Sequence, residues 1–302
     1  MIEILSTLQF VGILFVALLG LAFGSFLNVF LVRFPDGESI VRPRSHCRNC
    51  NHTLAWWENL PVLSWVFLRG RCRSCRSRIG LRYPIVELTI AILWTGCWLK
   101  FCLPVFSSST SELNSPRNVA LCLFEFLGSA LLCWLLVALA ALDAEHFWLP
   151  DLLTLPGIGL GFLYVLLRNC VSDYAISPAN LIHTAWISVI AILVSGGLLL
   201  LIRFSYWLVR RREGVGLGDV KLMAMLGAWL GTIGALESFV IATLVASAAA
   251  LVWLVVLAIR RESSDWGAAP LPLGTFLCVA ALSEIFAPHW LWLGLHLDFW
   301  TT

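Results

Sequence analysis

Charged side chains are scarce in this sequence. Asp, Glu, Lys and Arg make up 13% of its 302 residues, whereas 60% are hydrophobic and the mean hydropathy is +0.88. Soluble globular domains usually carry about 25% charged residues. The composition therefore excludes that class and predicts an all-α polytopic membrane protein.

The first apolar run, residues 8–32, lacks the small-residue cleavage site of a signal peptide. It is long enough to cross the hydrocarbon layer, so we expect a retained membrane helix. The polar segment that follows, residues 33–83, holds ten Arg and only three acidic residues. Because cytoplasmic loops are enriched in Lys and Arg, we expect this segment in the cytoplasm.

Lys and Arg are almost absent from two other polar segments, 104–118 and 169–180, which we therefore place outside. The basic clusters at 203–212 and 260–261 then fall on the cytoplasmic side, and both termini lie outside. The apolar runs predict about eight transmembrane helices, at residues 8–32, 84–103, 119–142, 152–168, 181–209, 221–236, 238–259 and 271–295.

Four of the ten cysteines form two C-x-x-C pairs in the basic cytoplasmic segment. The pairs are Cys47 with Cys50 and Cys72 with Cys75, separated by 21 residues. This spacing is close to that of zinc ribbons, and structural disulfides do not persist in a reducing cytoplasm. We predict a structural zinc ion bound by four thiolates, with a redox pair as the alternative.

The metal would also explain how so polar a segment folds. About fifty residues with little apolar content cannot build a hydrophobic core, so metal binding would supply the folding free energy. His46 and His52 adjoin the first pair, but four thiolates already fill the coordination of zinc. The other six cysteines are expected to be small buried hydrophobic residues.

Glycines and a carboxylate open the sixth expected helix, in the sequence Gly216-Leu217-Gly218-Asp219-Val220-Lys221-Leu222. An Asp at the mouth of a membrane helix is costly to bury and is therefore a functional candidate. The glycines would let a substrate backbone approach closely. Without a second carboxylate, Asp219 would be interpreted as a helix N-cap.

Asp143 provides that second carboxylate, because it ends the third expected helix at the same membrane face. Two carboxylates that share a proton can divide the roles of acid and base, as in aspartic proteases. Asp151 is a rival for Asp143, although a capping or substrate-orienting role fits it better. Lys221 should point away from Asp219 on a helix, toward the membrane interface or a substrate.

These motifs, taken in order, resemble those of bacterial type IV prepilin peptidases, which are membrane aspartic peptidases with a G-x-G-D motif. The resemblance covers nearly the whole chain. It rests on Gly24-Ser25-Phe26-Leu27-Asn28-Val29 with Arg33-Phe34-Pro35, the two Cys pairs, the segment from Glu58 to Trp65, Gly70-Arg71-Cys72, the segment from Arg82 to Glu87, the segment from Asp143 to Asp151, the segment from Gly216 to Leu222, and Pro272-Leu273-Gly274.

The resemblance implies that Asp143 and Asp219 are the catalytic pair. It also implies four supporting peptidase residues: Gly216, Gly218, Lys221 and Asp151. The enzyme would cut the short basic leader of prepilins or type II secretion pseudopilins after a glycine. It would then methylate the new N-terminal amine with S-adenosylmethionine. The implied location is the bacterial inner membrane, with lipid bilayer around the helices, the active site facing the cytoplasm and no nucleic-acid partner.

The resemblance further implies a division of labour between residues 1–103, with methyltransferase activity, and residues 104–302, the peptidase core. Gly70, Arg71 and the intramembrane Glu87 are the candidates for methyl transfer. The cytoplasmic segment contains no Gly-rich strand-to-helix turn of the dinucleotide-binding kind. The sequence therefore does not locate the site of the methyl donor.

Three residues depart from the pattern of the family. Arg48 stands where proline is usual inside the first Cys pair, and we expect only the rigidity of that turn to change. Leu273 and Thr275 stand where Phe and Pro are more usual, and we expect these two substitutions to affect packing and not chemistry.

Other classes of protein remain as alternatives. A transporter would need ionisable residues near mid-span and two matching halves, and no internal repeat is apparent here. A presenilin-like protease shares the G-x-G-D logic but normally lacks a cysteine segment. A membrane scaffold with a structural zinc knuckle would leave Asp143 and Asp219 unexplained.

Overall fold

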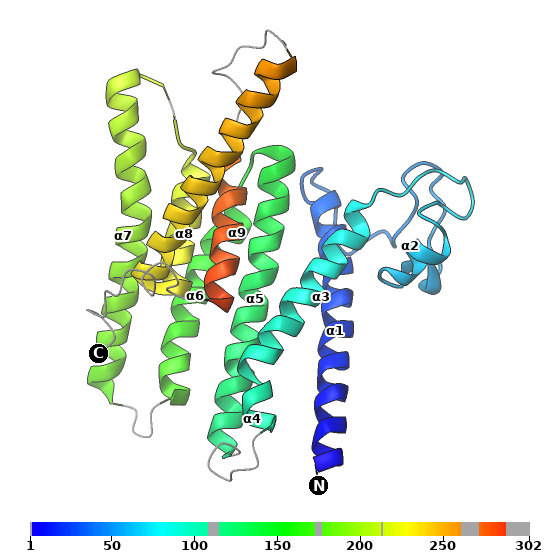
Figure 1. The fold of residues 1–302 in the computed structure, drawn as a ribbon, viewed down its shortest axis with the longest axis horizontal. Helices are drawn as coiled ribbons and strands as arrows, with labels where there is room; N and C mark the ends of the chain where they lie inside the picture. Colours follow the sequence, from blue (N-terminus) through cyan, green and yellow to red (C-terminus); the bar gives the residue numbers. More distant parts are fainter. Residues whose placement is uncertain (1, 108–114, 173–176, 213, 261–271, 288–302) are drawn as a thin grey trace. The chain divides into compact units, whose positions relative to one another are not determined.

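The computed structural model describes residues 2–107, 115–172, 177–212, 214–260 and 272–287 (Figure 1). Within these ranges six helices are long and apolar enough to cross a membrane. The predicted class, an all-α polytopic membrane protein, is thereby confirmed. The elements in order are α1 (Ile2–Arg33), the 3-10 helix η1 (Trp56–Asn59), α2 (Leu63–Phe67), α3 (Arg82–Phe101), α4 (Leu103–Ser107), α5 (Pro116–His146), α6 (Asp151–Ser172), α7 (Pro178–Arg210), α8 (Leu217–Arg260) and α9 (Leu273–Phe286).

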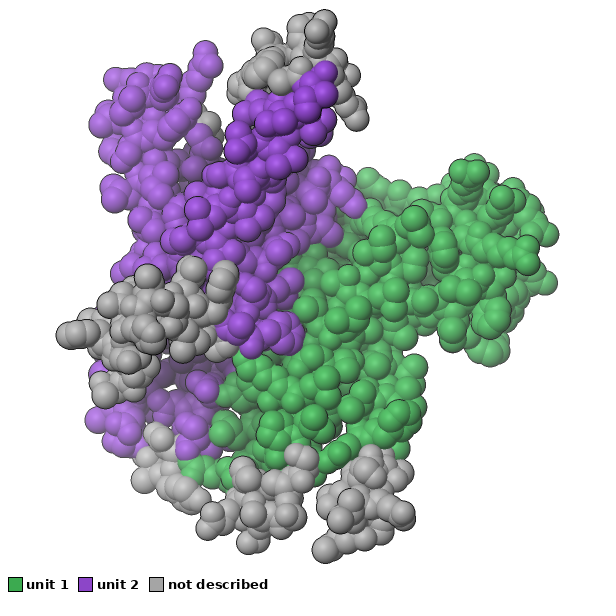
Figure 2. Space-filling view, viewed as in Figure 1, with its two compact units in different colours: residues 1–138 green, residues 139–302 purple. Residues whose placement is uncertain are grey.

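The chain divides into two compact units, residues 1–138 and 139–302, which Figure 2 shows in green and purple. We call them unit 1 and unit 2. The boundary falls inside α5, so one continuous helix contributes to both units. The functional division at residues 103 and 104 stays a prediction, because compactness does not report activity.

Unit 1 is built on a close contact between α1 and α3. A Cβ atom added to Gly24 would lie 2.6 Å from the Cα of Glu87, and one added to Gly20 would lie 2.7 Å from the Cα of Ala91. The two backbones therefore touch, as small residues permit in membrane helix pairs. The helix α3 is also tied to α5 by the Trp94 indole, which donates to the Ala130 carbonyl at 3.0 Å.

The two Cys-x-x-Cys turns of unit 1 share one backbone design. In each turn the amide of the first cysteine, Cys47 or Cys72, donates to the carbonyl five residues later at 2.9 Å. The residue after the second cysteine, Asn51 or Arg76, has a φ of 56° or 60° and donates back to the first cysteine's carbonyl. The turns are therefore short structural copies of each other, a local repeat that the sequence pattern did not reveal.

In unit 2 the helix α8 packs against α6, α7 and α9. Glycines allow the close approach: a Cβ atom added to Gly161 would lie 2.5 Å from the Trp229 ring, and one added to Gly227 would lie 2.5 Å from the Ala191 carbonyl oxygen. The Trp229 indole also donates to the Gly157 carbonyl at 2.8 Å. These contacts hold the first part of α8, which carries Asp219.

Gly231 interrupts α8 with φ 73° and ψ −179°. In Figure 1 the yellow and orange parts of the helix accordingly run in different directions. The two helices expected at 221–236 and 238–259 are therefore the two parts of α8, with the break at residue 231 and not at 237. The last expected helix, 271–295, is represented by α9; residues 271 and 288–295 lie outside the described residues. With these two adjustments the expected number of about eight helices is roughly met.

Candidate active site and metal centre

Asp143 lies in the last turn of α5 and is 6% exposed. Its Oδ2 atom accepts a hydrogen bond from the backbone N–H of Thr275 at 2.7 Å, and the Thr275 hydroxyl lies 3.0 Å away. The same hydroxyl lies 3.1 Å from the Ala140 carbonyl, so its single proton can serve either acceptor. Thr275 sits in the first turn of α9, where N–H groups lack acceptors within the helix. The Asp143 carboxylate therefore supplies a hydrogen-bond acceptor for the N-terminus of α9.

Asp219 lies in the first turn of α8. Its Oδ2 atom accepts a hydrogen bond from the Gly216 N–H at 3.2 Å, which folds the G-x-G-D turn back onto the carboxylate. A Cβ atom added to Gly216 would lie 3.3 Å from this oxygen, so glycine keeps the turn free of side-chain crowding. The positive end of the α8 dipole also favours a carboxylate at this position.

Leu149 packs against both Gly218, beside Asp219, and Gly274, beside Asp143. A Cβ atom added to Gly218 would lie 2.9 Å from the Leu149 Cβ, and one added to Gly274 would lie 2.8 Å from the Leu149 Cδ1 and 3.0 Å from Asp143 Oδ2. The α8 and α9 N-termini therefore pack on the segment that follows Asp143. Asp143 and Asp219 lie close enough for their charges to repel each other, and both charges also act on the buried Cys278 thiol. The structure thus gathers at one end of unit 2 the two carboxylates that the sequence paired.

Asp151 is engaged by Lys221. The lysine Nζ lies 2.5 Å from Asp151 Oδ1, with side-chain exposures of 31% and 60%. The ion pair links the first turns of α6 and α8. Asp151 thus has a cationic partner of its own, whereas Asp143 contacts the α9 N-terminus and faces the charge of Asp219.

The four paired cysteines of unit 1 converge, with all Sγ atoms within 4.8 Å of one another. Cys47 and Cys75 sulfurs are 3.8 Å apart, and Cys50 and Cys72 sulfurs are 4.0 Å apart. Four thiolates at about 2.3 Å from a tetrahedral zinc ion would lie about 3.8 Å from one another. The arrangement therefore fits one four-coordinate ion. All four are free cysteines.

Two polar neighbours prepare this site for a metal. The Ser77 hydroxyl lies 3.1 Å from the Cys75 sulfur and the Asn49 amide 3.6 Å from it. These hydrogen bonds, led by that of Ser77, lower the pKa of Cys75 to about 5, whereas burial and the neighbouring thiols raise the pKa of Cys50 to about 11, so the four thiols do not ionise alike. The His52 ring lies 3.3 Å from the Glu58 carboxylate, and its exclusion from the ligand set stays a prediction.

The three methyl-transfer candidates occupy different positions in unit 1. Glu87 is 7% exposed and accepts a hydrogen bond from the Val62 N–H at 2.7 Å. Gly70 has a φ of 63° and lies behind Trp65, whose ring would be 2.8 Å from an added Cβ atom. Arg71 is exposed and forms an isolated β-bridge with Arg78 at the base of the second Cys turn. We call the polar segment with the two Cys turns, residues 33–83, the cysteine module. Gly70 and Arg71 therefore shape the backbone of this module, whereas Glu87 faces its interior.

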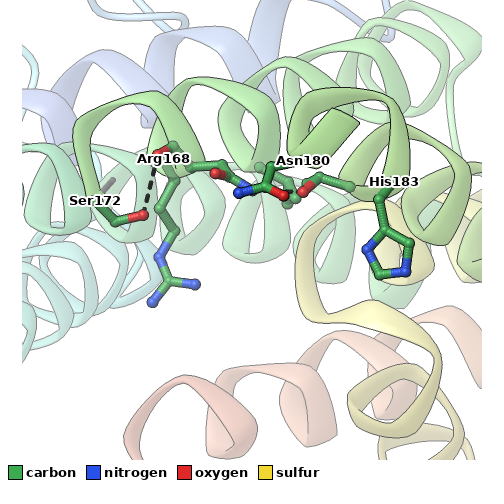
Figure 3. Close-up of a pocket in the computed structure, with 7 residues that line it drawn as sticks. Arg168, Ser172, Asn180 and His183 are labelled. Atoms are coloured by element: carbon green, nitrogen blue, oxygen red, sulfur yellow. Dashed lines mark hydrogen bonds between the residues drawn. The ribbon is translucent and has the colours of Figure 1, made fainter. Parts of the chain in front are cut away.

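A separate cavity of about 260 Å³ lies between the end of α6 and the start of α7 (Figure 3). Arg168 and His183 extend to the same side of it, and Ser172 donates to the Asn169 carbonyl at 3.1 Å. Its lining residues include no carboxylate, and it lies at the opposite end of α6 from Asp151. It is therefore not an extension of the acidic site.

The fold and the sites define a polytopic membrane protein with paired helix-end carboxylates and a four-cysteine module. Residues 18–101 match the bacterial peptidase A24 N-terminal domain, and residues 130–259 match the type IV leader peptidase family. The chain belongs to the type IV leader peptidase family. The predicted family and enzyme class, an aspartic-type peptidase with methyltransferase activity, are confirmed.

Three curated relatives are each named prepilin leader peptidase/N-methyltransferase. The protein of Burkholderia pseudomallei (strain K96243) is 34% identical over 308 residues, covering 93% of this chain and 87% of the relative. That of Aeromonas hydrophila is 33% identical over 306 residues, covering 93% and 92%. That of Myxococcus xanthus (strain DK1622) is 37% identical over 218 residues, covering 72% of this chain and 55% of the relative. No solved structure matches the chain.

Thr275 is the site residue that sequence reasoning missed. The expectation that its departure from the family pattern affects only packing is wrong, because its N–H and hydroxyl both contact Asp143. A proline here could not donate the backbone hydrogen bond. The available signal was its position two residues into a helix, where a free N–H is expected.

Proposed function

We propose that this chain cleaves the short basic leader of type IV prepilins or type II secretion pseudopilins and then methylates the new N-terminal amine. The observation that carries the peptidase part is the juxtaposition of Asp143 and Asp219 on two helix ends of unit 2. The scissile bond would be the one after the leader's final glycine, as the family resemblance implies. Asp143 and Asp219 are the proposed catalytic pair.

In the proposed mechanism one carboxylate of the pair deprotonates a water molecule that attacks the scissile carbonyl. The other carboxyl, protonated, donates to the carbonyl oxygen and later to the leaving amine. Thr275 and Gly216 each bind an Oδ2 atom of the pair, which leaves both Oδ1 atoms for water and substrate. Gly216 and Gly218 are the proposed supporting glycines: without a side chain at Gly216 an extended substrate backbone can come close to Asp219, and without one at Gly218 Leu149 can pack against this turn.

The proposed methyl donor is S-adenosylmethionine, which carries a transferable methyl group on a positively charged sulfur. Gly70, Arg71 and Glu87 are the proposed residues for this step, with Gly70 and Arg71 shaping the module and Glu87 reaching its interior. Cys47, Cys50, Cys72 and Cys75 are proposed to hold a structural zinc ion. The fit of the four sulfurs to a tetrahedral ion supports this assignment.

Both units place their basic residues at the end that carries the proposed chemistry. In unit 1 the Arg-rich segment follows the end of α1, and in unit 2 Arg210, Arg211 and Arg212 lie between α7 and the G-x-G-D turn. Because Lys and Arg concentrate on the cytoplasmic side, we propose a bacterial inner-membrane location with both sites facing the cytoplasm. Prepilins or pseudopilins and the lipid bilayer are the proposed partners.

The test is prepilin cleavage by the detergent-solubilised, zinc-loaded protein, with N-terminal methylation read by mass spectrometry. Asp143→Asn and Asp219→Asn should each lower cleavage by at least about a hundredfold, the scale of a lost general acid or base. Asp151→Asn is the matched control and should keep most activity. If Asp151→Asn is inactive while Asp143→Asn is active, Asp151 and not Asp143 is the partner of Asp219 in the catalytic pair. A wild-type protein that cleaves no prepilin would favour the scaffold or transporter alternative.

A further inference from the structure

Unit 1 contains a cavity of about 500 Å³ that the peptidase chemistry does not use. Its walls come from the last turns of α1, the first turns of α3 and the inner face of the cysteine module, including Cys47, Cys72 and Ser77. Cavities of about 300–1,000 Å³ are typical of sites for small organic ligands. The cysteine module therefore encloses a ligand-sized space, and the metal would hold one of its walls in place.

Two buried carboxylates face this space. Glu58 is 5% exposed and Glu87 is 7% exposed, and both line the cavity. Glu58 uses one oxygen, Oε2, for the Ala55 N–H at 2.7 Å and for His52. Its second oxygen, Oε1, is buried and has no hydrogen-bond partner among the described residues. A buried anionic oxygen without a partner is costly, so this wall of the cavity is suited to a cationic group of a ligand, whereas Arg33, Arg48, Arg73 and Arg78 line other parts of the same cavity.

Asn28 adds a second unsatisfied acceptor. Its side chain is 3% exposed, its Nδ2 donates to the Tyr83 carbonyl at 2.9 Å, and its Oδ1 has no partner among the residues described. The Tyr83 carbonyl accepts from Nδ2 and thereby fixes the orientation of the amide, so Oδ1 is the atom left for a ligand. Asn28 and Glu87 are near neighbours across the α1 and α3 contact.

The cavity also offers an aromatic wall and cations at its edge. The Trp65 indole donates to the Ile79 carbonyl at 3.1 Å, and Gly70 lies directly behind the ring. A ring held in this way can stack on a planar heterocycle. Arg73 and Arg78 line the same cavity and can pair with a ligand carboxylate.

We propose that this cavity binds S-adenosylmethionine, with the Glu58 and Glu87 carboxylates and Asn28 Oδ1 facing its positively charged sulfur and amine groups. The inference rests on the proposed function in that the ligand is the methyl donor of that reaction. The ligand has the groups that the walls require: an adenine ring, a carboxylate, an ammonium group and a sulfonium group.

The same walls suit the transfer step. The neutral amine uses its lone pair to form the new N–C bond, the S–CH₃ bond breaks, and its electron pair stays on sulfur to give S-adenosylhomocysteine. The nitrogen then releases a proton to a carboxylate of the cavity. The Ala55 N–H and the His52 ring lower the pKa of Glu58, so this carboxyl stays ionised and able to hold a cation.

The test is binding of tritiated S-adenosylmethionine to the zinc-loaded protein by equilibrium dialysis. Glu58→Gln and Glu87→Gln keep an oxygen for the Ala55 and Val62 N–H groups, so the local fold is preserved while the charge is removed. Each should weaken binding by about tenfold, the scale of a lost charge-assisted hydrogen bond. Glu125→Gln, in α5 and outside the cavity lining, is the matched control and should bind as wild type.

S-adenosylhomocysteine separates charge recognition from a general loss of structure. It lacks the positive sulfur, so the preference of wild type for S-adenosylmethionine over S-adenosylhomocysteine should shrink in the Gln variants. Prepilin cleavage and zinc content of the same samples report the fold. Ultraviolet crosslinking of the tritiated donor should label peptides that contain residues 58–65 or 79–87, independently of any variant.

The outcomes are distinguishable. If wild type binds and methylates while both Gln variants bind normally, or if the crosslink maps only elsewhere, the cavity assignment is wrong and the proposed function stands. If wild type carries zinc and cleaves prepilin but neither binds the donor nor methylates, the methyltransferase part of the proposed function fails together with the cavity assignment.

Discussion

The two units hold their acidic side chains in different ways. In unit 2, Asp143 and Asp219 sit on helix ends that are fixed by glycine-mediated packing of α6, α7, α8 and α9. In unit 1, Glu58 lies in a polar segment whose turns are organised around four cysteines. Helix packing needs no cofactor, whereas a polar segment without a core would depend on a bound metal, as proposed for the four cysteines. The peptidase and methyltransferase activities should therefore respond separately to perturbation.

Loss of the metal should produce the largest difference between the methyltransferase and peptidase activities. Cys72→Ser, or removal of zinc with a chelator, should reduce methylation to background because the cavity wall formed by the module unfolds. Prepilin cleavage should change by no more than about threefold, since helix packing holds the Asp pair without a metal. Cys170→Ser, a free cysteine in α6, is the control. Equal loss of both activities on chelation would show that the units depend on one another.

Gly274→Ala should affect unit 2 and therefore leader cleavage. The added Cβ would lie 3.0 Å from Asp143 Oδ2 and 2.8 Å from Leu149 Cδ1, so the carboxylate must move. Displacement of a catalytic group by a fraction of an ångström to 1 Å should lower kcat for cleavage by about ten- to a hundredfold. Gly197→Ala, where an added Cβ meets nothing within 4 Å, should leave cleavage unchanged. Wild-type kcat in Gly274→Ala would mean that Asp143 tolerates movement and is not positioned by α9.

Thr275→Val tests the hydroxyl contact alone, because it keeps the backbone N–H and the side-chain shape. Loss of one hydrogen bond to the Asp143 carboxylate, a proposed member of the catalytic pair, should lower kcat by about three- to tenfold. Thr275→Ser retains the hydroxyl and should restore most of the activity. If Val and Ser variants cleave at the same rate, the hydroxyl serves only the Ala140 carbonyl.

Lys221→Met should have the smallest effect. The Lys221–Asp151 pair is partly exposed, and such pairs contribute about 0–1 kcal/mol to stability. Leader cleavage and the thermal unfolding midpoint, measured by a dye-based melt, should remain close to wild type. A tenfold loss of cleavage with an unchanged melt would instead assign Lys221 a direct role in substrate binding.

Much of the molecule could be predicted from its sequence. The apolar runs and the Arg distribution gave the helical membrane class, because the bilayer restricts spanning structures to a few that leave strong patterns. The G-x-G-D turn and the C-x-x-C pairs were visible because their chemistry requires fixed local spacings. The break in α8 was placed at 237 and lies at Gly231, since a single glycine does not by itself say whether a helix continues.

The sequence alone determined the class of protein, its family, the pairing of Asp143 with Asp219 as candidates, and the four-cysteine set. Tertiary structure decided which groups surround them: Thr275 on Asp143, Lys221 on Asp151, and the cavity where Glu58, Glu87 and Asn28 meet. Those partners are up to 132 residues apart along the chain. No local spacing records such contacts, because they arise only when helices pack and bring distant turns to the same place.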